Sequence, residues 1–469
     1  MNKSFTSSKQ VFEWLSGFIN LERGQKPKSF NLDRMKILTE LADNPEKCAP
    51  SIHIAGSKGK GSVTGMLAVM LTAAGFKVAR YMSPHVTDIR ERICLGDQFF
   101  DDDVYCSAGD ELRGIAEGNL PQIFDSKNPD GSEPTFWELL TLLFFLCTRK
   151  SKCDVMVVET GMGGRLDSTN VLDPLVSVIT LIELEHTSFL GDTIAKIAGE
   201  KAGIIKDGKP LILAKQNSEA LEVFKNKAQE KNSPLYYFPE IAELTNVNIT
   251  PHCTEFHLAL SSSSLRVLSA SVPPCKPLLF SIPLPGKVQA ENAALAITAL
   301  KAAFPKIADE TLRKGLANLK IPARFEKIAE QPLFIIDGAH TPESLALCIE
   351  TFCSLYGKGG ILLFGCAADK DEQTMAKIAH SFFSKIIITT PGNFKISNPQ
   401  KVYEAFAAIT GKEKTELILD TKEAVEKAIL FAKTSHGGTE TRSEDESEYL
   451  PIFGTGSFYL VSEIRKFVI

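Results

Sequence analysis

The chain has 469 residues, of which 44% are hydrophobic and 23% are charged, and its formal net charge is −5 with a pI near 6.0. This length exceeds one ordinary hydrophobic core and predicts two domains or three. The slightly acidic balance excludes a broad basic surface for nucleic acid or anionic membranes, so any recognition of phosphate must be local. We therefore expect a globular enzyme that acts on a small molecule.

The N-terminal segment and the cysteines both argue against an exported protein. The N-terminal segment MNKSFTSSKQ lacks the apolar core of a signal peptide, and no apolar run approaches the length of a membrane span. The ten cysteines are scattered without a Cys-x-x-Cys pair, which is typical of reduced thiols rather than of disulfides or a zinc site. We expect a cytoplasmic protein.

The strongest local signal is residues 51–62, SIHIAGSKGKGS, in which a short apolar strand runs into a glycine-rich loop. Such a loop directs backbone N–H groups and a lysine, here Lys60, at nucleotide phosphates. A helix over residues 63–74 and a strand over residues 77–82 are predicted to follow. The usual motif has four residues between its first glycine and the Gly-Lys pair, but here only Ser57 and Lys58 intervene. A glycine turn that binds nothing therefore stays open as the alternative.

Strand-like runs alternate with helical patterns along most of the chain, which predicts an α/β fold with parallel sheets covered on both faces. Ligands of such sheets collect at the carboxyl ends of the strands. Besides residues 51–55, the runs are residues 154–158, 175–181, 333–336, 361–364 and 385–389.

Two departures from this alternation organise the chain. Residues 234–283 alternate polar and apolar positions and predict a small antiparallel β insert, followed by a helix over residues 292–304. Pro322 precedes a fresh βα series, so we place a linker at residues 319–324, between a domain of residues 1–318 and one of residues 325–469. The polar stretch 436–448 is typical of a solvated loop.

Three titratable residues stand where chemistry is expected. Glu159 follows an apolar strand and precedes a glycine-rich turn, so its carboxylate could ligate the magnesium that accompanies a nucleoside triphosphate. His186 follows the next predicted strand, whose end we expect to neighbour Glu159, and a structural histidine is the alternative. Lys201 lies in a helical run over residues 194–205, where an exposed lysine or an ion-pair partner is the plainer interpretation.

Taken together, the motifs resemble the folylpolyglutamate synthase and dihydrofolate synthase family, a branch of the Mur ligase superfamily of ATP-dependent amide-forming enzymes. The similarity spans nearly the whole chain. Besides the phosphate loop, it is carried by Asn31-Leu32-Asp33-Arg34-Met35, Ser83-Pro84-His85, Glu91-Arg92-Ile93, Thr135-Phe136-Trp137-Glu138, residues 159–170 (ETGMGGRLDSTN), Gly199-Glu200-Lys201-Ala202-Gly203-Ile204, Asn292-Ala293-Ala294, Ala323-Arg324-Phe325-Glu326, Asp337-Gly338-Ala339-His340 and Ala368-Asp369-Lys370-Asp371.

The resemblance implies a P-loop ATPase-like central domain with a small β insert and a Rossmann-like C-terminal domain. It implies an acyl phosphate mechanism, in which a folate or pteroate carboxylate attacks ATP and L-glutamate then displaces phosphate. Implied partners are ATP, L-glutamate and folates or dihydropteroate, with no nucleic acid and no membrane, and we expect a monomer. Two magnesium sites are implied as cofactors, and Lys201 falls on a lysine that is carbamylated in the family.

The same resemblance assigns the remaining site residues. The catalytic positions are Lys60, Glu159, His186 and Lys201. The metal positions are Ser83, Glu159, His186 and Lys201. The ATP positions are Gly56, Ser57, Lys58, Gly59, Lys60, Gly61, Ser62, Asn292, Arg324, Asp337 and His340. The folate positions are Phe30, Thr135, Phe136 and Leu166, within a pterin region that also includes residues 27–29.

Three positions depart from the usual family pattern. Lys58 is found where the family usually has asparagine, Glu185 where it usually has aspartate, and Thr341 where it usually has asparagine. Lys58 adds positive charge where phosphates are expected. Two other functions stay open: a cell-wall Mur-type ligase, for which recognition of a UDP-sugar would be expected, and a nucleotide-binding protein without catalysis.

Overall fold

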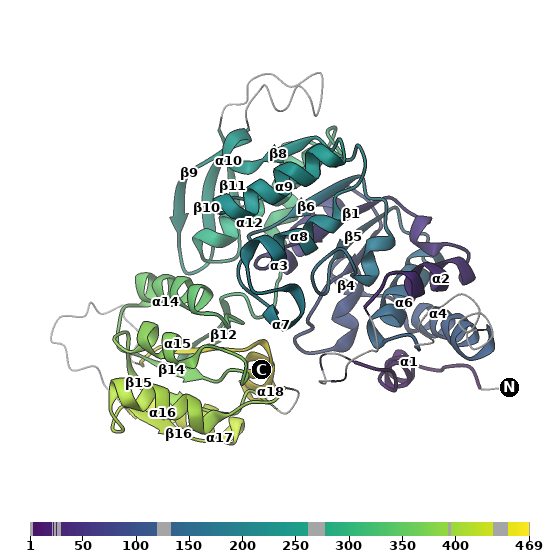
Figure 1. Cartoon of the computed structure of the whole chain (residues 1–469). Helices are drawn as coiled ribbons and strands as arrows, with labels where there is room; N and C mark the ends of the chain where they lie inside the picture. The colour runs from purple at the N-terminus through teal and green to yellow at the C-terminus, as the bar shows by residue number, and fades with distance from the viewer. Residues whose placement is uncertain are drawn as a thin grey trace. The chain divides into compact units, whose positions relative to one another are not determined.

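The computed structural model describes residues 3–20, 22, 25, 30–119, 133–260, 277–392, 395–434 and 449–468. The chain divides into two compact units (Figure 1). The first contains residues 1–248, 254–283 and 287–320, and the second contains residues 249–253, 284–286 and 321–469. The polar stretch 436–448 and residues 27–29 of the expected pterin region lie outside the described residues.

The first unit is built on an eight-stranded sheet with the order β4-β3-β2-β5-β1-β6-β7-β8. Its strands are β1 (Ser51–Ala55), β2 (Val78–Tyr81), β3 (Ile93–Leu95), β4 (Gln98–Phe99), β5 (Val155–Glu159), β6 (Val176–Ile179), β7 (Leu211–Leu213) and β8 (Leu235–Tyr237). Neighbours from β2 to β8 are parallel, and β3 and β4 form an antiparallel edge. Every residue of β1, β5 and β6 is buried, as expected for central strands covered on both faces.

Helices cover this sheet. They are α1 (Ser8–Leu15), α2 (Asp33–Leu41), α3 (Lys60–Ala73), α4 (Asp102–Gly114), α6 (Phe136–Lys150), α7 (Thr187–Leu190), α8 (Ile194–Lys201), α9 (Ser218–Glu230), α10 (Phe238–Ile241), α12 (Lys287–Ala303) and α13 (Asp309–Ala317), with short helical turns at η2 (Pro45–Lys47), η3 (Ile89–Arg92), η4 (Ile115–Asn119), η5 (Ser168–Val171) and η6 (Ala202–Ile204). Helix α3 packs on β1, β2 and β5, and α12 packs on β6 and β7. Helices α1, α4 and α6 share one core with β2 and β5, and α8 and α9 share another with β6 and β7.

The β insert is smaller than residues 234–283. Strands β9 (Ala242–Ile249), β10 (Thr254–Leu260) and β11 (Leu278–Ile282) form a three-stranded sheet in which β10 and β11 are antiparallel. The first predicted part, β8, pairs in parallel with β7 and belongs to the large sheet instead. The run Leu235-Tyr236-Tyr237 is too short for its pattern of polar and apolar residues to show to which of the two sheets it belongs.

The second unit has a six-stranded sheet with the order β12-β13-β17-β14-β15-β16. Its strands are β12 (Glu326–Glu330), β13 (Leu333–Ile336), β14 (Gly360–Phe364), β15 (Phe383–Ile388), β16 (Thr415–Leu417) and β17 (Ile452–Thr455), and its helices are α14 (Pro342–Tyr356), α15 (Glu372–Ala379), α16 (Pro399–Thr410), α17 (Thr421–Thr434) and α18 (Phe458–Val468). All neighbours are parallel except β12 and β13. The alternation of strands and helices produces the predicted Rossmann-like arrangement.

Candidate active site

The glycine-rich loop leaves β1 at the carboxyl edge of the sheet and ends where α3 begins at Lys60. Gly56 has a φ of +148° and Gly59 a φ of +87°, a region that L side chains rarely adopt. A Cβ atom on Gly56 would lie 1.8 Å from Thr180 Oγ1, and one on Gly59 would lie 2.4 Å from Asn292 Oδ1. Both glycines are therefore required by conformation and by close neighbours.

The segment after β6 holds this loop in place. The Ser57 N–H donates to the Leu181 carbonyl over 2.8 Å, and the Ser57 hydroxyl donates to the Glu183 carbonyl over 3.0 Å. Lys58 and Leu181 also form an isolated antiparallel bridge. Because the chain turns to pair with the loop here, β6 ends at Ile179 rather than continuing to residue 181.

Two lysines converge on one carbonyl of the loop. Lys60 Nζ donates to the Gly56 carbonyl over 2.9 Å, and Lys201 Nζ donates to the same oxygen over 2.7 Å. Lys201 also forms an ion pair with Glu185, with 2.6 Å between Nζ and Oε1, and its side chain is only 1% exposed. Lys201 is thus a buried ion-pair partner at the phosphate loop rather than an exposed helical lysine.

The electrostatics of this pair follow from its burial. Burial lowers the pKa of Lys201 to about 8, with a further lowering by Lys60 and an opposing effect of Glu185. Burial raises the pKa of Glu185, but the positive charges of Lys201, Lys60 and His186 outweigh that effect and bring it to about 2. At neutral pH the pair is ionised, and Lys201 is closer to losing its proton than an ordinary lysine is.

Glu159 ends β5 beside the loop and is 3% exposed. Its Oε2 accepts a hydrogen bond of 3.2 Å from the Ser83 N–H, and it lies 3.5 Å from the position of a Cβ on Gly61. The structure therefore brings Ser83 and Glu159 together next to the start of α3. Ile54 lies opposite Glu159 in the β1 and β5 ladder.

His186 is placed differently from the sequence expectation. β1 separates β6 from β5, so the ends of those two strands are not neighbours. His186 lies beyond the end of β6, at the N-cap of α7 with a φ of +46°. Its charge nevertheless acts on Glu185, which links it to the two lysines at the loop.

The donor set suits a magnesium ion that is carried mainly by phosphate. Among the residues that the structure describes, no group of three or more His, Cys, Asp or Glu side chains is arranged to hold a metal by itself. Magnesium in nucleotide sites is usually held by one or two carboxylates together with phosphate oxygens and water. Glu159 next to the loop, with Ser83 beside it, fits that arrangement.

The expected pterin residues have clear structural surroundings. Thr135 caps α6 through a capping box with Glu138, and Phe136 is 2% exposed in the core shared with α4. Leu166 is half-buried in the glycine-rich turn after β5. Phe30 is 42% exposed, and its ring lies 5.9 Å from that of Phe189 between centroids.

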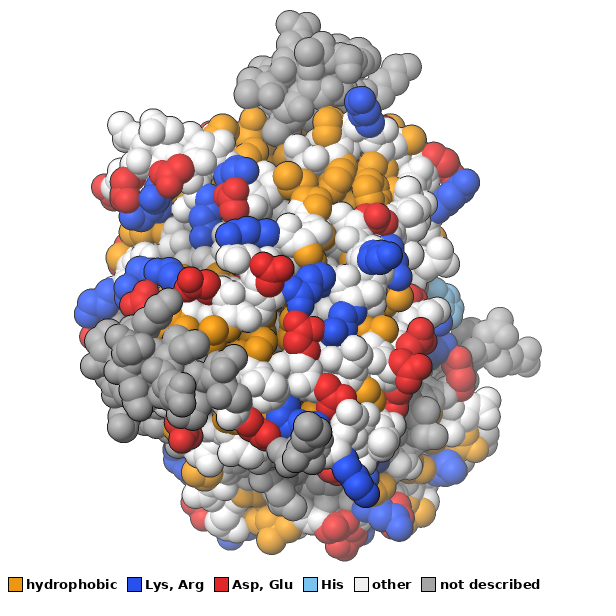
Figure 2. All heavy atoms as spheres, turned by 90° about the vertical axis from the view of Figure 1, so that its right-hand side faces the viewer, with side chains coloured by type: hydrophobic (Ala, Val, Ile, Leu, Met, Phe, Trp, Pro, Cys, Tyr) orange, Lys and Arg blue, Asp and Glu red, His pale blue; other side chains and the backbone are white. Residues whose placement is uncertain are grey.

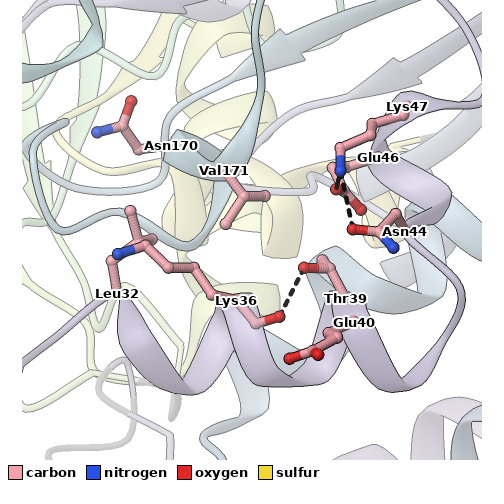
Figure 3. Close-up of a pocket in the computed structure, with 9 residues that line it drawn as sticks. All are labelled: Leu32, Lys36, Thr39, Glu40, Asn44, Glu46, Lys47, Asn170 and Val171. Atoms are coloured by element: carbon pink, nitrogen blue, oxygen red, sulfur yellow. Dashed lines mark hydrogen bonds and ion pairs between the residues drawn. The ribbon is translucent and has the colours of Figure 1, made fainter.

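A separate cavity of about 550 Å³ lies between α2 and the turns η2 and η5 (Figure 3). Lys36 and Glu40 of α2 and Glu46 and Lys47 of η2 line it, so its charges are mixed. It contains no residue of the predicted site.

The surface charges are mixed as well. Figure 2 shows Lys and Arg side chains interspersed with Asp and Glu on the face in view, without a broad basic patch there.

The second unit carries the remaining predicted nucleotide contacts. The Asp337 carboxylate accepts backbone hydrogen bonds of 2.8 Å from Phe325 and from Ala339. Arg324 lies over the ring of Phe458 at 4.3 Å, and the His340 ring is 5.9 Å from the same ring. Thr341, where the family usually has asparagine, caps α14.

Sequence reasoning missed two residues of this arrangement. Glu185 entered only as a departure from the family pattern, yet it is the ion-pair partner of Lys201. Thr180 lies directly against Gly56. No spacing in the sequence connects either residue with its partner, because both contacts depend on how the intervening residues fold.

These features define a Mur ligase. A family described as the Mur ligase middle domain matches residues 113–300, and one described as the Mur ligase, glutamate ligase domain matches residues 323–436. The dihydrofolate synthase/folylpolyglutamate synthase of Bacillus subtilis is 31% identical over 98% of this chain and 99% of its own length. The folylpolyglutamate synthase of Lacticaseibacillus casei is 30% identical over 92% and 94%. The chain belongs to the folylpolyglutamate synthase and dihydrofolate synthase family and is an ATP-dependent ligase.

Solved structures agree with this membership. The folylpolyglutamate synthase of Mycobacterium tuberculosis, in crystal structures with ADP and AMPPCP, has a TM-score of 0.83 and 25% identity, and the match covers 98% of this chain and 97% of that chain. The apo form of the L. casei enzyme has a TM-score of 0.80 and 26% identity over 98% and 99%. The predicted fold class is confirmed. No helix in the described part of the chain is long and apolar enough to cross a bilayer.

Proposed function

We propose that this enzyme adds L-glutamate to folates and also joins L-glutamate to dihydropteroate, which gives dihydrofolate. The observation that carries the proposal is the convergence of Lys60 and Lys201 on the loop carbonyl of Gly56, next to the buried carboxylate of Glu159. The B. subtilis relative, whose name includes both activities, supports the pair of acyl substrates.

The reaction joins two anions before it forms the amide. A carboxylate oxygen of the acyl substrate bonds to the γ-phosphorus of ATP, and the bond from that phosphorus to ADP breaks. The amine of L-glutamate then attacks the acyl carbon, the bond to phosphate breaks, and the amine loses a proton. The ammonium of Lys60 and the N–H groups at the start of α3 lower the repulsion between the anions as they meet.

Ser83 and Glu159 would hold a magnesium ion, which supplies charge neutralisation on the phosphate oxygens. His186, which the resemblance also assigns to a metal position, would act near Glu185 and Lys201 instead. Lys201 would take up CO2 as a carbamate, which requires a neutral amine, and its lowered pKa increases the neutral fraction. A carbamate beside Glu185 would place two anions together. A second magnesium ion, which the Lys201 carbamate would help to hold, would supply positive charge that offsets this repulsion.

The resemblance also assigns Asn292, Arg324, Asp337 and His340 to nucleotide binding. Asp337 already holds the turn at Phe325, so a nucleotide contact there would use the remaining lone pairs of its carboxylate. We further propose that the enzyme acts as a monomer, with L-glutamate as the amine substrate.

A phosphate-release assay with ATP, magnesium and L-glutamate tests the proposal, with dihydropteroate and tetrahydrofolate compared as acyl substrates. We expect phosphate release with both, and only when an acyl substrate is present. Lys60→Ala and Glu159→Ala should each abolish release while the protein stays folded by circular dichroism. ATP binding without release for either acyl substrate would contradict the proposed function, and normal turnover by a folded variant would contradict the assigned roles.

A further inference from the structure

Exposed apolar side chains of the first unit gather around the segment that follows β6. Within the described part of that unit, the exposed large apolar residues are Leu181, Leu184, Phe189, Phe30, Phe99 and Leu279. The first three lie between β6 and α8, and Phe30 contacts Phe189. Apolar surface is therefore concentrated beside the phosphate loop, which the same segment holds in place.

Phe30 and Phe189 form the aromatic part of this surface. Their ring centroids are 5.9 Å apart with an interplanar angle of 75°, which is an edge-to-face contact. The two residues are 42% and 41% exposed, so ring surface stays accessible on both. Two aromatic side chains in a defined mutual orientation offer a planar ligand ring a stacking or edge contact with little further ordering.

The position of Phe189 connects this surface with the reacting groups. Its N–H donates to the His186 carbonyl over 2.8 Å, so the ring lies one helical turn after His186. The charge of His186 acts on Glu185, which pairs with Lys201 at the loop. A substrate whose carboxylate faces the loop would thus direct its apolar part toward the segment that carries Phe189.

We propose that Phe189, supported by Phe30, binds the benzene ring of the acyl substrate and sets the preference between dihydropteroate and folates. This inference rests on the proposed function. In dihydropteroate the reacting carboxylate is bonded directly to the benzene ring, whereas in a folate a glutamyl group separates them. The ring of dihydropteroate must therefore stay closer to the phosphate loop, and its binding depends more on Phe189.

Steady-state kinetics of Phe189→Ala test this inference, with KM and kcat measured separately for dihydropteroate, tetrahydrofolate and ATP. We expect KM for dihydropteroate to rise about fivefold, which corresponds to about 1 kcal/mol for one aromatic contact. KM for tetrahydrofolate should change less than twofold, and KM for ATP should not change. Phe189→Tyr, which keeps the ring, should retain the wild-type values.

Phe467→Ala is a matched control, because Phe467 is 43% exposed on α18 of the second unit. It should leave all three KM values unchanged. Fluorescence titration of dihydropteroate without ATP gives a readout that does not depend on turnover, and we expect the same loss for Phe189→Ala there. Unchanged dihydropteroate binding, or an equal rise in KM for both acyl substrates or for ATP, would overturn the inference. Absence of turnover by the wild-type enzyme would instead overturn the proposed function.

Discussion

At the scale of single residues, the pair of Lys201 and Glu185 is the most consequential electrostatic feature of the first unit. The two side chains are 1% and 16% exposed, so little water is available to compensate either charge if its partner is lost. Loss of one partner of a buried pair usually costs about 3–5 kcal/mol, because the other charge stays behind in a poorly solvated place.

We predict that Glu185→Gln lowers the free energy of unfolding by about 3 kcal/mol at pH 7. The folded pKa of Glu185, about 2, is below its ordinary value of 4.5, so the stabilisation is complete above pH 4.5 and is lost as the pH falls toward 2. Urea unfolding at pH 7, 4 and 3 should show the difference from wild type narrowing with acid. Asp192→Asn is the control, since Asp192 pairs with Lys196 at 2.7 Å on the exposed surface, and it should change little. A difference in free energy of unfolding between wild type and Glu185→Gln that does not vary with pH would contradict the low pKa of Glu185.

Lys201 itself gives a second prediction at this scale. Its pKa of about 8 means that the neutral amine becomes abundant as the pH rises from 7 to 9, and only the neutral amine reacts with CO2. With ¹³C-labelled bicarbonate, we expect a carbamate resonance that grows over this range and is missing in Lys201→Ala. That variant should lose most activity, and acetate at high concentration should restore part of it. Full activity of Lys201→Ala without additive would refute the carbamate.

At the scale of elements, the phosphate loop depends on glycines whose Cβ positions are already filled. Gly59 and Gly75 provide a matched comparison, since their φ angles are +87° and +89°. A Cβ on Gly59 would meet Asn292 Oδ1 at 2.4 Å, whereas one on Gly75 would meet no atom within 4 Å. The two sites therefore share the conformational cost of an L residue and differ in the space around it.

We predict that Gly75→Ala costs about 1 kcal/mol of stability, the usual effect of a left-handed φ on a residue with a Cβ. Gly59→Ala should cost more, because the buried Asn292 side chain must shift away from the new Cβ, and it should weaken binding of a non-hydrolysable ATP analogue at least tenfold. Urea unfolding and isothermal titration calorimetry measure the two effects. If Gly59→Ala and Gly75→Ala lost equal stability and nucleotide affinity did not change, the contact between Gly59 and Asn292 would have no effect on stability or binding.

At the scale of the whole molecule, local patterns predicted the order of elements better than their contacts. Residues 51–55 and 333–336 became β1 and β13 with the expected bounds, because short apolar runs beside turn residues carry their own signal. The antiparallel pairing of β12 with β13, the assignment of β8 to the large sheet and the end of β6 at Ile179 were not predictable in this way. The first depends on a hairpin whose first strand, β12, was not predicted, and the other two depend on pairing with segments that lie further away along the chain.

The same limit applies to the candidate site. The Gly59-Lys60 motif located a glycine-rich loop at the end of β1, since the conformational freedom of glycine is a property of the residue itself. The burial of Lys201 depends on packing around α8 and on Glu185, which a helical pattern does not reveal. Resemblance to the family therefore named the lysine, whereas the structure supplied the reason why its pKa is low.

Each unit contains its own hydrophobic core, and this gives a prediction for the molecule as a whole. Phe453 of β17 is fully buried in the second unit and stacks on Phe352 at 4.9 Å. Phe144 of α6 is fully buried in the first unit, 5.2 Å from Tyr81. Truncation of a buried phenylalanine to alanine costs about 3–5 kcal/mol, and the loss falls on the core that contained the ring.

We predict that Phe453→Ala accelerates amide hydrogen exchange in the strands of the second unit and leaves that of β1, β5 and β6 near the wild-type rate. Phe144→Ala should give the converse pattern, because neither core shares its buried side chains with the other. Exchange followed by mass spectrometry resolves the two sets of strands. If either variant accelerated exchange equally in both units, the chain would unfold as one cooperative body, and the separation of the cores would not govern its stability.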